Sequence, residues 1–139
     1  MSAFEQLKNI SPALLRVPKP QGSEPFIAFE VVFKGENVVG EAGPYRQFFA
    51  DLSNELLSDN SGNGIIIKAP NYRDTHVEGI ETYIINPSRT SALDLQIYEF
   101  LGILFGCCAR TGSKLALNLP AMFWKPLVGE FLTYEDLSQ

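Results

Sequence analysis

The stretch that organises this chain is Ser91-Ala92-Leu93-Asp94-Leu95-Gln96-Ile97-Tyr98-Glu99-Phe100-Leu101-Gly102-Ile103-Leu104-Phe105-Gly106-Cys107-Cys108-Ala109-Arg110. Ser91 and Asp94 stand three positions apart, as in a capping box with Asp in place of the usual Glu, so a helix is expected to begin here. Apolar residues occupy almost every face of that helix, which is typical of the buried centre of a domain. Gly112 fits the left-handed residue that ends many helices, so the predicted helix runs to about Arg110.

Two glycines, Gly102 and Gly106, lie four positions apart on one face of this predicted helix. Each costs up to about 1 kcal/mol of helix stability relative to Ala, so a compensating benefit is expected. We expect that the missing side chains let another backbone approach closely. The same spacing occurs in membrane helix dimers, but the polar flanks and short length favour helix packing in a soluble protein.

Length and composition indicate a folded protein with the size of one domain. The chain has 139 residues, of which 45% are hydrophobic and 19% charged. The net charge is −5 and the 11 Lys and Arg are scattered singly, so we expect no nucleic-acid partner. The longest apolar stretch, Leu93 to Cys108, is judged too short and too charged at one end to cross a bilayer, so no membrane partner is expected.

Cysteine usage and the start of the chain bear on its compartment. The only cysteines, Cys107 and Cys108, are adjacent, and neighbours on a helix point about 100° apart, so they cannot easily bond to each other. The absence of a spaced cysteine set and of a signal-peptide pattern favours a reducing, intracellular compartment. We expect the cytoplasm, with the nucleus as an open alternative.

The N-terminal region is predicted to hold a helix and a linker. The helix lies within Ala3 to Leu15, and Val17 to Pro25 is a Pro-rich linker. The apolar face of the helix would consist of Phe4, Leu7, Ile10 and Leu14.

A strand and a second helix are predicted next. Phe26 to Phe33 is rich in Phe, Ile and Val and is predicted to be a strand, followed by a glycine-rich turn. Pro44 suits the first position of a helix, which should end before Ser58. Its apolar positions are Tyr45, Phe48, Phe49, Leu52 and Leu56.

Two short strands are predicted in the middle of the chain. They are Ile65 to Ile67 and Ile80 to Ile85, and Asn86-Pro87 should end the second because Pro cannot continue a ladder. The polar spans Ser58 to Gly64 and Pro70 to Gly79 are predicted to be loops.

The C-terminal region is predicted to hold a short helix and then a helix start. Pro120 to about Val128 should be helical, with Met122, Phe123 and Leu127 facing inward. Thr133 and Asp136 repeat the capping pattern, yet three residues follow Asp136, which indicates a truncated helix.

These blocks, in this order and spacing, resemble the N-terminal lobe of HECT-type ubiquitin ligases from about Phe29 to Leu137. The strongest blocks are Phe100 to Gly106, Leu119-Pro120, Phe123-Trp124-Lys125 and Leu132-Thr133-Tyr134-Glu135-Asp136-Leu137, supported by Phe33 to Phe49 and Tyr83 to Pro87. The chain departs from the family pattern at Gly40, Ala42-Gly43 and Gln47, which loosens any subfamily assignment. The Pro-rich lead-in and the segment Ile103 to Arg110 look more like the large HERC-like or HECTD-like members.

The resemblance implies an α+β fold that is mainly helical, like a HECT N-lobe, with a long buried central helix and short antiparallel strands. Residues 1–25 would form the N-terminal helix and Pro-rich linker. Residues 26–139 would form a partial N-lobe, truncated before the subdomain that docks the conjugating enzyme and before the C-lobe.

The resemblance also implies a function for the parent protein, a transferase that passes ubiquitin through a cysteine thioester to substrate lysines. The present segment would be a structural scaffold without the catalytic cysteine, inactive alone. Its partners would be the remainder of the HECT domain and, in the parent, the conjugating enzyme and ubiquitin. The alternative is a non-catalytic module that binds ubiquitin or another partner through its polar loops; a hydrolase is the least favoured.

Individual candidates for chemistry have plainer structural explanations. Cys107 and Cys108 suit small buried helix residues with no nearby group to lower the pKa of either thiol. His76 is the only histidine and suits a solvated loop, and Gly62-Asn63-Gly64 lacks the Lys-Ser/Thr ending of a phosphate loop. Trp124 is expected in the core, with an interface role as the alternative.

Some HECT members hold a second ubiquitin through an aromatic residue near the strand before Asn-Pro. Here Glu81 stands at about that place and Tyr83 two positions on, so the site is not carried over. We therefore assign no catalytic, cofactor-binding or metal-binding residue and expect no cofactor.

A helix that starts at Thr133 and is not completed would leave apolar surface uncovered. We predict that the chain is marginally stable or self-associates, as measured by thermal unfolding and sedimentation velocity. A monomer with a high melting temperature would contradict this expectation.

Overall fold

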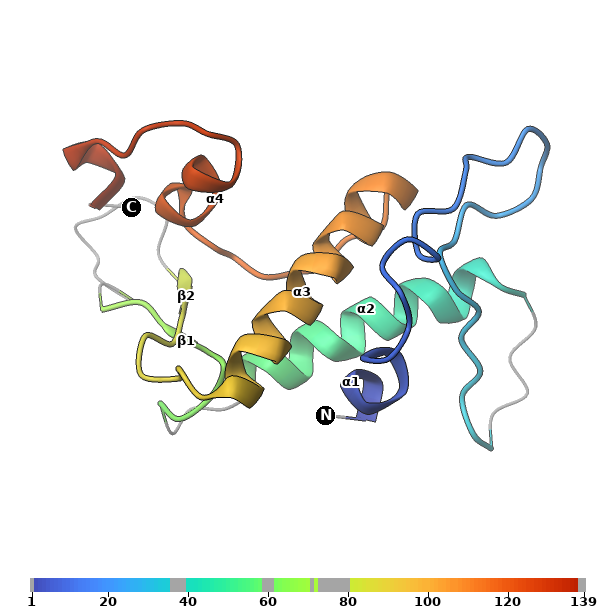
Figure 1. Cartoon of the computed structure of the whole chain (residues 1–139), viewed down its shortest axis with the longest axis horizontal. Coiled ribbons are helices and arrows are strands. Elements are labelled where there is room, and N and C mark those ends of the chain that lie inside the picture. Colours follow the sequence, from blue (N-terminus) through green and yellow to red (C-terminus); the bar gives the residue numbers. More distant parts are fainter. Residues whose placement is uncertain (1, 36–39, 59–61, 71, 73–80, 138–139) are drawn as a thin grey trace. The chain divides into compact units, whose positions relative to one another are not determined.

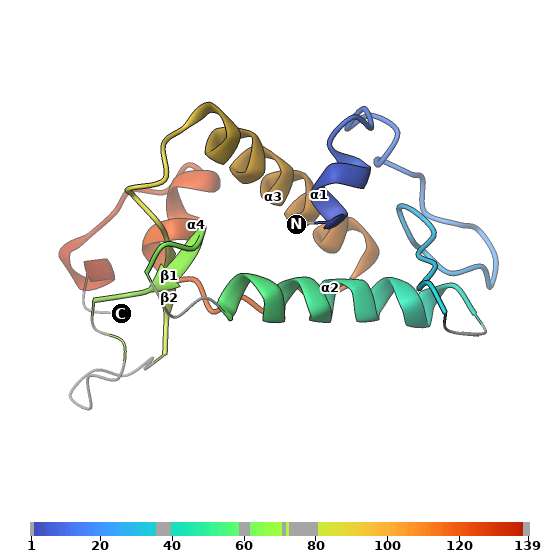
Figure 2. The same ribbon diagram turned by 90° about the horizontal axis from the view of Figure 1, so that it is seen from below.

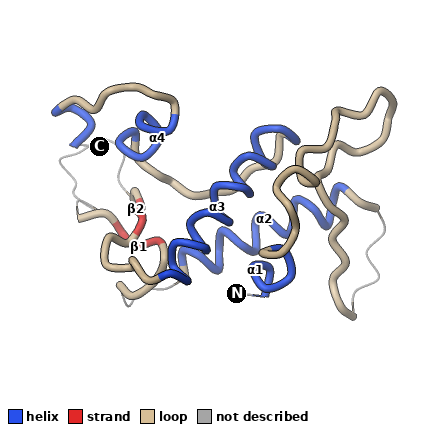
Figure 3. Tube along the Cα trace, in the orientation of Figure 1, coloured by secondary structure: helices blue, strands red, loops and turns tan. Residues whose placement is uncertain are grey.

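The computed structural model describes residues 2–35, 40–58, 62–70, 72 and 81–137 (Figure 1). It contains helices and one small two-stranded sheet, which confirms a mixed α+β class with more helix than strand (Figure 3). Two compact units can be separated, Met1–Ser53 with Thr90–Ala116 and Asn54–Arg89 with Leu117–Gln139, here called the first and second units. The elements are α1 (Ser2–Leu7), α2 (Ala42–Leu57), β1 (Ile66–Lys68), β2 (Tyr83–Ile85), α3 (Ala92–Thr111), α4 (Ala121–Leu127) and a 3-10 turn, η1 (Tyr134–Leu137).

The long helix of the first unit, α3, begins and ends where the sequence predicts. Ser91 is the N-cap: its Oγ accepts from the Asp94 N–H at 3.2 Å, and the Ser91 N–H donates to the Asp94 carboxylate at 3.0 Å. Gly112 closes the helix with φ of 70°, in the left-handed region. The predicted burial on almost every face is wrong, because Leu93 and Leu95 are exposed and the core-facing residues form one stripe. That stripe consists of Phe100, Leu101, Leu104, Cys107 and Cys108.

The core of the first unit is aromatic. The rings of Phe4 and Phe100 meet edge to face with centroids 5.5 Å apart, so α1 packs on α3. Phe29 contacts two α2 rings in the same manner, Tyr45 at 5.0 Å and Phe48 at 5.4 Å. Edge-to-face aromatic pairs add about 0.5–1.5 kcal/mol beyond the area they bury.

One buried hydroxyl links α2 to the segment after α3. The Ser53 Oγ donates to the Phe49 carbonyl at 2.8 Å and accepts from the Ala116 N–H at 2.9 Å. Both bonds satisfy groups that would otherwise lose water without compensation. Figure 2 shows α2 as one continuous helix.

Three sequence predictions in the first unit are corrected. The N-terminal helix ends at Leu7 rather than Leu15, because a residue before proline is disfavoured in helical conformation and Pro12 follows soon after. Isolated turns replace the predicted last helical turns, so Leu15 is buried and Leu14 exposed. Helix α2 begins at Ala42, which places Pro44 inside the first turn, where its missing N–H is still harmless.

The predicted strand at Phe26 to Phe33 is not formed within the described residues. A strand needs a partner for its backbone groups, and apolar composition alone does not supply one. Instead the segment is held by side-chain packing, through Phe29 against α2. Gly35 and Gly40 have φ of 85° and 105°, in agreement with the predicted glycine turn, while residues 36–39 lie outside the described part.

The second unit contains the antiparallel pair β1–β2, in which Ile67 lies opposite Ile84. Strand β1 lies one residue later than predicted. Of the predicted strand Ile80 to Ile85, Ile80 lies outside the described residues and β2 covers Tyr83–Ile85. Glu81 has φ of 79°, a conformation that interrupts a strand, which explains the later start among the described residues. The Tyr83 N–H donates to the Asn118 carbonyl at 2.8 Å on the other side of β2.

Asn86 ends β2 as the Asn-Pro pattern predicts, and its side chain also organises the neighbouring turn. The buried amide donates to the carbonyls of Gly62 and Gly64, at 3.1 and 2.8 Å. Its Oδ1 accepts from the Ser88 N–H at 3.0 Å. Parts of the two predicted polar loops, residues 59–61, 71 and 73–79, lie outside the described residues.

The C-terminal elements follow the predicted positions but not the predicted burial. Helix α4 starts after Pro120 and contains Pro126 in its last turn. Met122 and Leu127 were expected to face inward, yet both are exposed, because apolar character does not itself provide a covering surface. The predicted cap before η1 is present: the Thr133 N–H donates to the Asp136 carboxylate at 2.6 Å. Asp136 also pairs with Lys125 of α4 at 2.7 Å.

Among the described residues one helix, α3, is long and apolar enough to cross a membrane by length and composition alone. The sequence argument that this stretch is too short is therefore wrong, since the caps set a length of 20 residues. Core helices of soluble proteins meet the same criteria, so the finding is weak evidence for a membrane span.

The expected close backbone approach at Gly102 and Gly106 is also wrong. A Cβ built at either position would have no heavy atom of the described residues within 4 Å, apart from its own helix. We therefore predict that Gly102→Ala and Gly106→Ala each stabilise the chain by up to about 1 kcal/mol, because Ala favours a helix more than Gly does. Urea unfolding of each variant would measure this, and destabilisation would show that a neighbour occupies that space.

Candidate functional site

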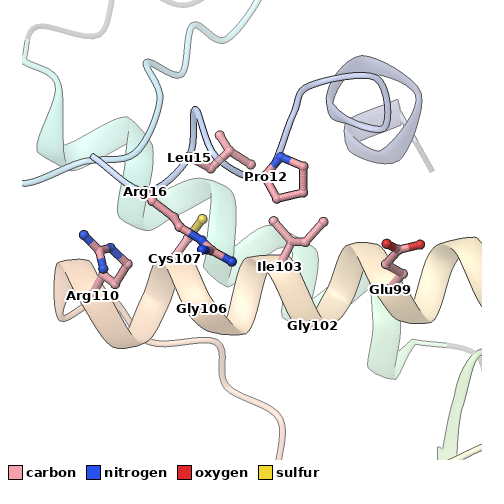
Figure 4. Close-up of a pocket in the computed structure, with 9 residues that line it drawn as sticks. All are labelled: Pro12, Leu15, Arg16, Glu99, Gly102, Ile103, Gly106, Cys107 and Arg110. Atoms are coloured by element: carbon pink, nitrogen blue, oxygen red, sulfur yellow. The ribbon is translucent and has the colours of Figure 1, made fainter. Parts of the chain in front are cut away.

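One concavity of the first unit that carries charged groups is a groove along α3, here called the α3 groove. It has a volume of about 440 Å³. One wall comes from the turn after α1, and the floor and opposite wall come from α3 (Figure 4). It is lined by Pro12, Leu15, Arg16, Glu99, Gly102, Ile103, Gly106, Cys107 and Arg110.

The two glycines make the floor of the α3 groove. Gly102 and Gly106 present bare backbone where side chains would otherwise fill the space. The turn after α1 is shaped by backbone bonds such as Leu15 N–H to the Pro12 carbonyl, at 3.2 Å. The groove continues into a smaller hollow of about 180 Å³ that shares Pro12, Leu15, Glu99 and Ile103.

The charges of the α3 groove are separated along the helix. Arg16 and Arg110 lie over the C-terminal half of α3, and Glu99 lies toward the other end (Figure 4). The Arg110 guanidinium donates to the Val17 carbonyl at 3.0 Å, which fixes its position. A guanidinium has five N–H donors, so this single bond leaves most of its capacity for a ligand.

Both cysteines are buried, and their thiols have raised pKa values. Cys107 is 3% and Cys108 7% exposed. Burial raises the pKa of the Cys107 thiol, and the nearby Arg110 only partly opposes this effect. Burial, with a smaller contribution from Cys107, raises the pKa of Cys108 to about 11. Neither thiol is therefore prepared to act as a nucleophile at neutral pH.

The other sequence candidates are not brought together. His76 lies outside the described residues. Trp124 is exposed, so the predicted core position is wrong, although its indole N–H donates to the Leu119 carbonyl at 3.1 Å. Gly62 has φ of 78°, as expected of a turn. Within the described ranges no group of three His, Cys, Asp or Glu could hold a metal ion.

Tyr83 belongs to a small cluster on the second unit. Its ring lies 5.3 Å from that of Tyr72, and the two hydroxyls are 3.3 Å apart. The Lys68 ammonium lies 4.9 Å from the centre of the Tyr72 ring, a cation–π contact. Through these contacts Tyr83 packs β2 against the segment after β1.

Sequence reasoning missed the α3 groove. Its local signal is the pair Gly102 and Gly106, a spacing that by itself predicts close helix packing. The wall formed by Pro12 to Arg16 depends on how the N-terminal turn docks on a helix some 90 residues later, as the Arg110–Val17 bond with a separation of 93 residues illustrates. Local patterns do not specify such a contact.

Comparison with known proteins gives one consistent result. Residues 47–139 match the family described as HECT-domain (ubiquitin-transferase). E3 ubiquitin-protein ligase HERC2 of Mus musculus is 36% identical over 115 residues, which cover 83% of this chain and 2% of that protein. Probable E3 ubiquitin-protein ligase HECTD4 of Homo sapiens is 35% identical over 134 residues, covering 96% of this chain and 3% of that protein.

The chain thus spans only 2–3% of the length of these relatives. No solved structure matches it. The resemblance to large HERC-like and HECTD-like members is confirmed by these two relatives. The family match covers about two thirds of the chain and includes α3, α4 and η1. The chain therefore belongs to the HECT-domain family.

Proposed function

We propose that this chain supplies part of the N-terminal lobe of a HECT ubiquitin-protein ligase, as a structural scaffold and not as its catalytic centre. The longer protein would transfer ubiquitin from a conjugating enzyme to a cysteine and then to a substrate lysine. Its partners would be the remainder of the HECT domain, the conjugating enzyme and ubiquitin. Family membership and the ligase names of the relatives support this chemistry.

The observation that carries the scaffold role is the burial of the only two thiols. A cysteine accepts ubiquitin as a thiolate that reaches the carbonyl carbon of the incoming thioester. With a pKa of about 11, Cys108 would be ionised in roughly one molecule in ten thousand at pH 7. Cys107, which is also buried and has a raised pKa, offers no better access.

Exposed apolar side chains of the second unit support a role in holding neighbouring structure. Phe131 is 92% and Tyr134 93% exposed, and Leu127 and Val128 of the same region are exposed as well. The Lys125–Asp136 ion pair and the Thr133 cap hold η1 against α4. A firmly held apolar surface of this kind suits attachment of further parts of a domain.

The first test concerns thioester formation. The chain is incubated with ubiquitin-charged conjugating enzyme and the products are separated on a non-reducing gel. We expect no ubiquitin adduct of the chain that disappears after treatment with a reducing agent. The physical reason is that neither thiol is accessible or ionised.

The matched control is the double variant Cys107→Ala/Cys108→Ala, which should give the same gel pattern as the parent chain. A thiol-sensitive ubiquitin adduct that forms on the parent chain and disappears in the double variant would refute the scaffold role.

The second test uses the pH dependence of stability. In the unfolded chain the Cys108 thiol ionises near its ordinary pKa of 9.0, whereas in the folded chain burial raises the pKa to about 11. Between these two pH values the folded chain keeps a proton that the unfolded chain releases. The contribution of the Cys108 thiol to the free energy of unfolding is therefore complete below pH 9 and is lost as the pH rises toward 11. We expect Cys108 to contribute about 2 kcal/mol less to the free energy of unfolding at pH 10.5 than at pH 7.

Urea unfolding of the parent chain and of Cys108→Ala at both pH values measures this difference. The alanine variant has no thiol at this position, so the stability gap between the two proteins should change with pH by that amount. A gap that does not change would show that the Cys108 thiol is hydrated in the folded chain.

A further inference from the structure

We propose that the α3 groove binds a short acidic peptide segment of a partner protein, with apolar side chains over Gly102 and Gly106 and carboxylates at Arg16 and Arg110. This site goes beyond the scaffold role and does not depend on it.

The floor of the α3 groove is open and can accept side chains. Because a Cβ at Gly102 or Gly106 would meet no described heavy atom within 4 Å outside its own helix, the space above both is free in this structure. The apolar walls come from Pro12, Leu15 and Ile103. A volume of about 440 Å³ lies within the range of ligand sites in proteins, so a few side chains can fit.

Charge complementarity selects the chemistry of the occupant. Arg16 and Arg110 gather two positive charges at one end of the groove, in a chain whose net charge is −5. The guanidinium fork matches a carboxylate, with two parallel N–H donors to its two oxygens. The C-terminal end of α3 itself carries partial negative charge, so an anion there must be held by the arginines and not by the helix.

Glu99 determines the orientation of the bound peptide. Its separation from Arg110 favours a peptide over a small acid. It lies eleven residues before Arg110 on α3, a separation of about 16 Å at a rise of roughly 1.5 Å per residue. An extended peptide rises about 3.3 Å per residue, so about five residues cover this length. Glu99 repels acidic groups at its end, so the carboxylates of the peptide belong at the Arg16 and Arg110 end.

The test is a fluorescence-anisotropy titration of the chain into labelled peptides. The probe is Ala-Leu-Ala-Leu-Glu-Glu, and the matched control is Ala-Leu-Ala-Leu-Gln-Gln. We expect saturable binding of the acidic probe, at least tenfold tighter than that of the control and weakened by added salt. Equal affinity for both peptides, or no saturable binding of the acidic probe, would overturn the proposal.

Three variants locate the site. Arg16→Gln/Arg110→Gln should weaken binding of the acidic probe at least tenfold, whereas Arg46→Gln, an exposed arginine of α2, should leave it unchanged. Gly106→Leu should block binding while the helical circular dichroism is retained, because leucine suits a helix better than glycine. Unchanged binding in both groove variants, or displacement of the probe by an equal concentration of glutarate, would overturn a peptide site here.

Discussion

Burial of one face of α3 is the constraint on which the first unit depends. Phe100, Leu101 and Leu104 are buried on one stripe of the helix, and the Phe4 ring reaches Phe100 at 5.5 Å. Burying a side chain of this size contributes roughly 1.5–3 kcal/mol, far more than a surface contact does. The caps at Ser91 and Gly112 fix where the helix begins and ends, and hence which residues form that stripe.

Helix α3 has both a buried stripe, which contains the cysteines, and an exposed part, which contains two glycines. The inward stripe contains the cysteines and holds them uncharged, while another part of α3 exposes Gly102 and Gly106. The chain can therefore belong to a family of ubiquitin transferases although neither of its thiols is reactive. The α3 groove, with arginines at one end and Glu99 at the other, lies over these exposed glycines, and Cys107 of the inward stripe also contributes to its lining.

Features that rest on local geometry could be predicted from the sequence. The capping box at Ser91, the bond from the Thr133 N–H to the Asp136 carboxylate, the helix end at Gly112 and the strand stop at Asn86-Pro87 each involve residues within a few positions of one another. Features that need a distant partner could not. The segment Phe26 to Phe33 has strand-like composition but packs on α2 through Phe29, and apolar residues of α4 such as Leu127 remain exposed. The α3 groove was missed for the same reason, since its wall at Pro12 to Arg16 comes from the far end of the chain.

The Asn86 side chain has one more consequence, for chemical ageing. Asparagine loses its amide when the backbone nitrogen of the next residue attacks the side-chain carbonyl, and Pro87 has no N–H for that reaction. An aspartate at position 86 would face the carbonyl oxygens of Gly62 and Gly64 with an acceptor in place of a donor. The amide that ties this turn to β2 thus stands at a sequence position where this attack cannot occur. By contrast Asn63 precedes Gly64, which has an N–H for this attack and no side chain to hinder it.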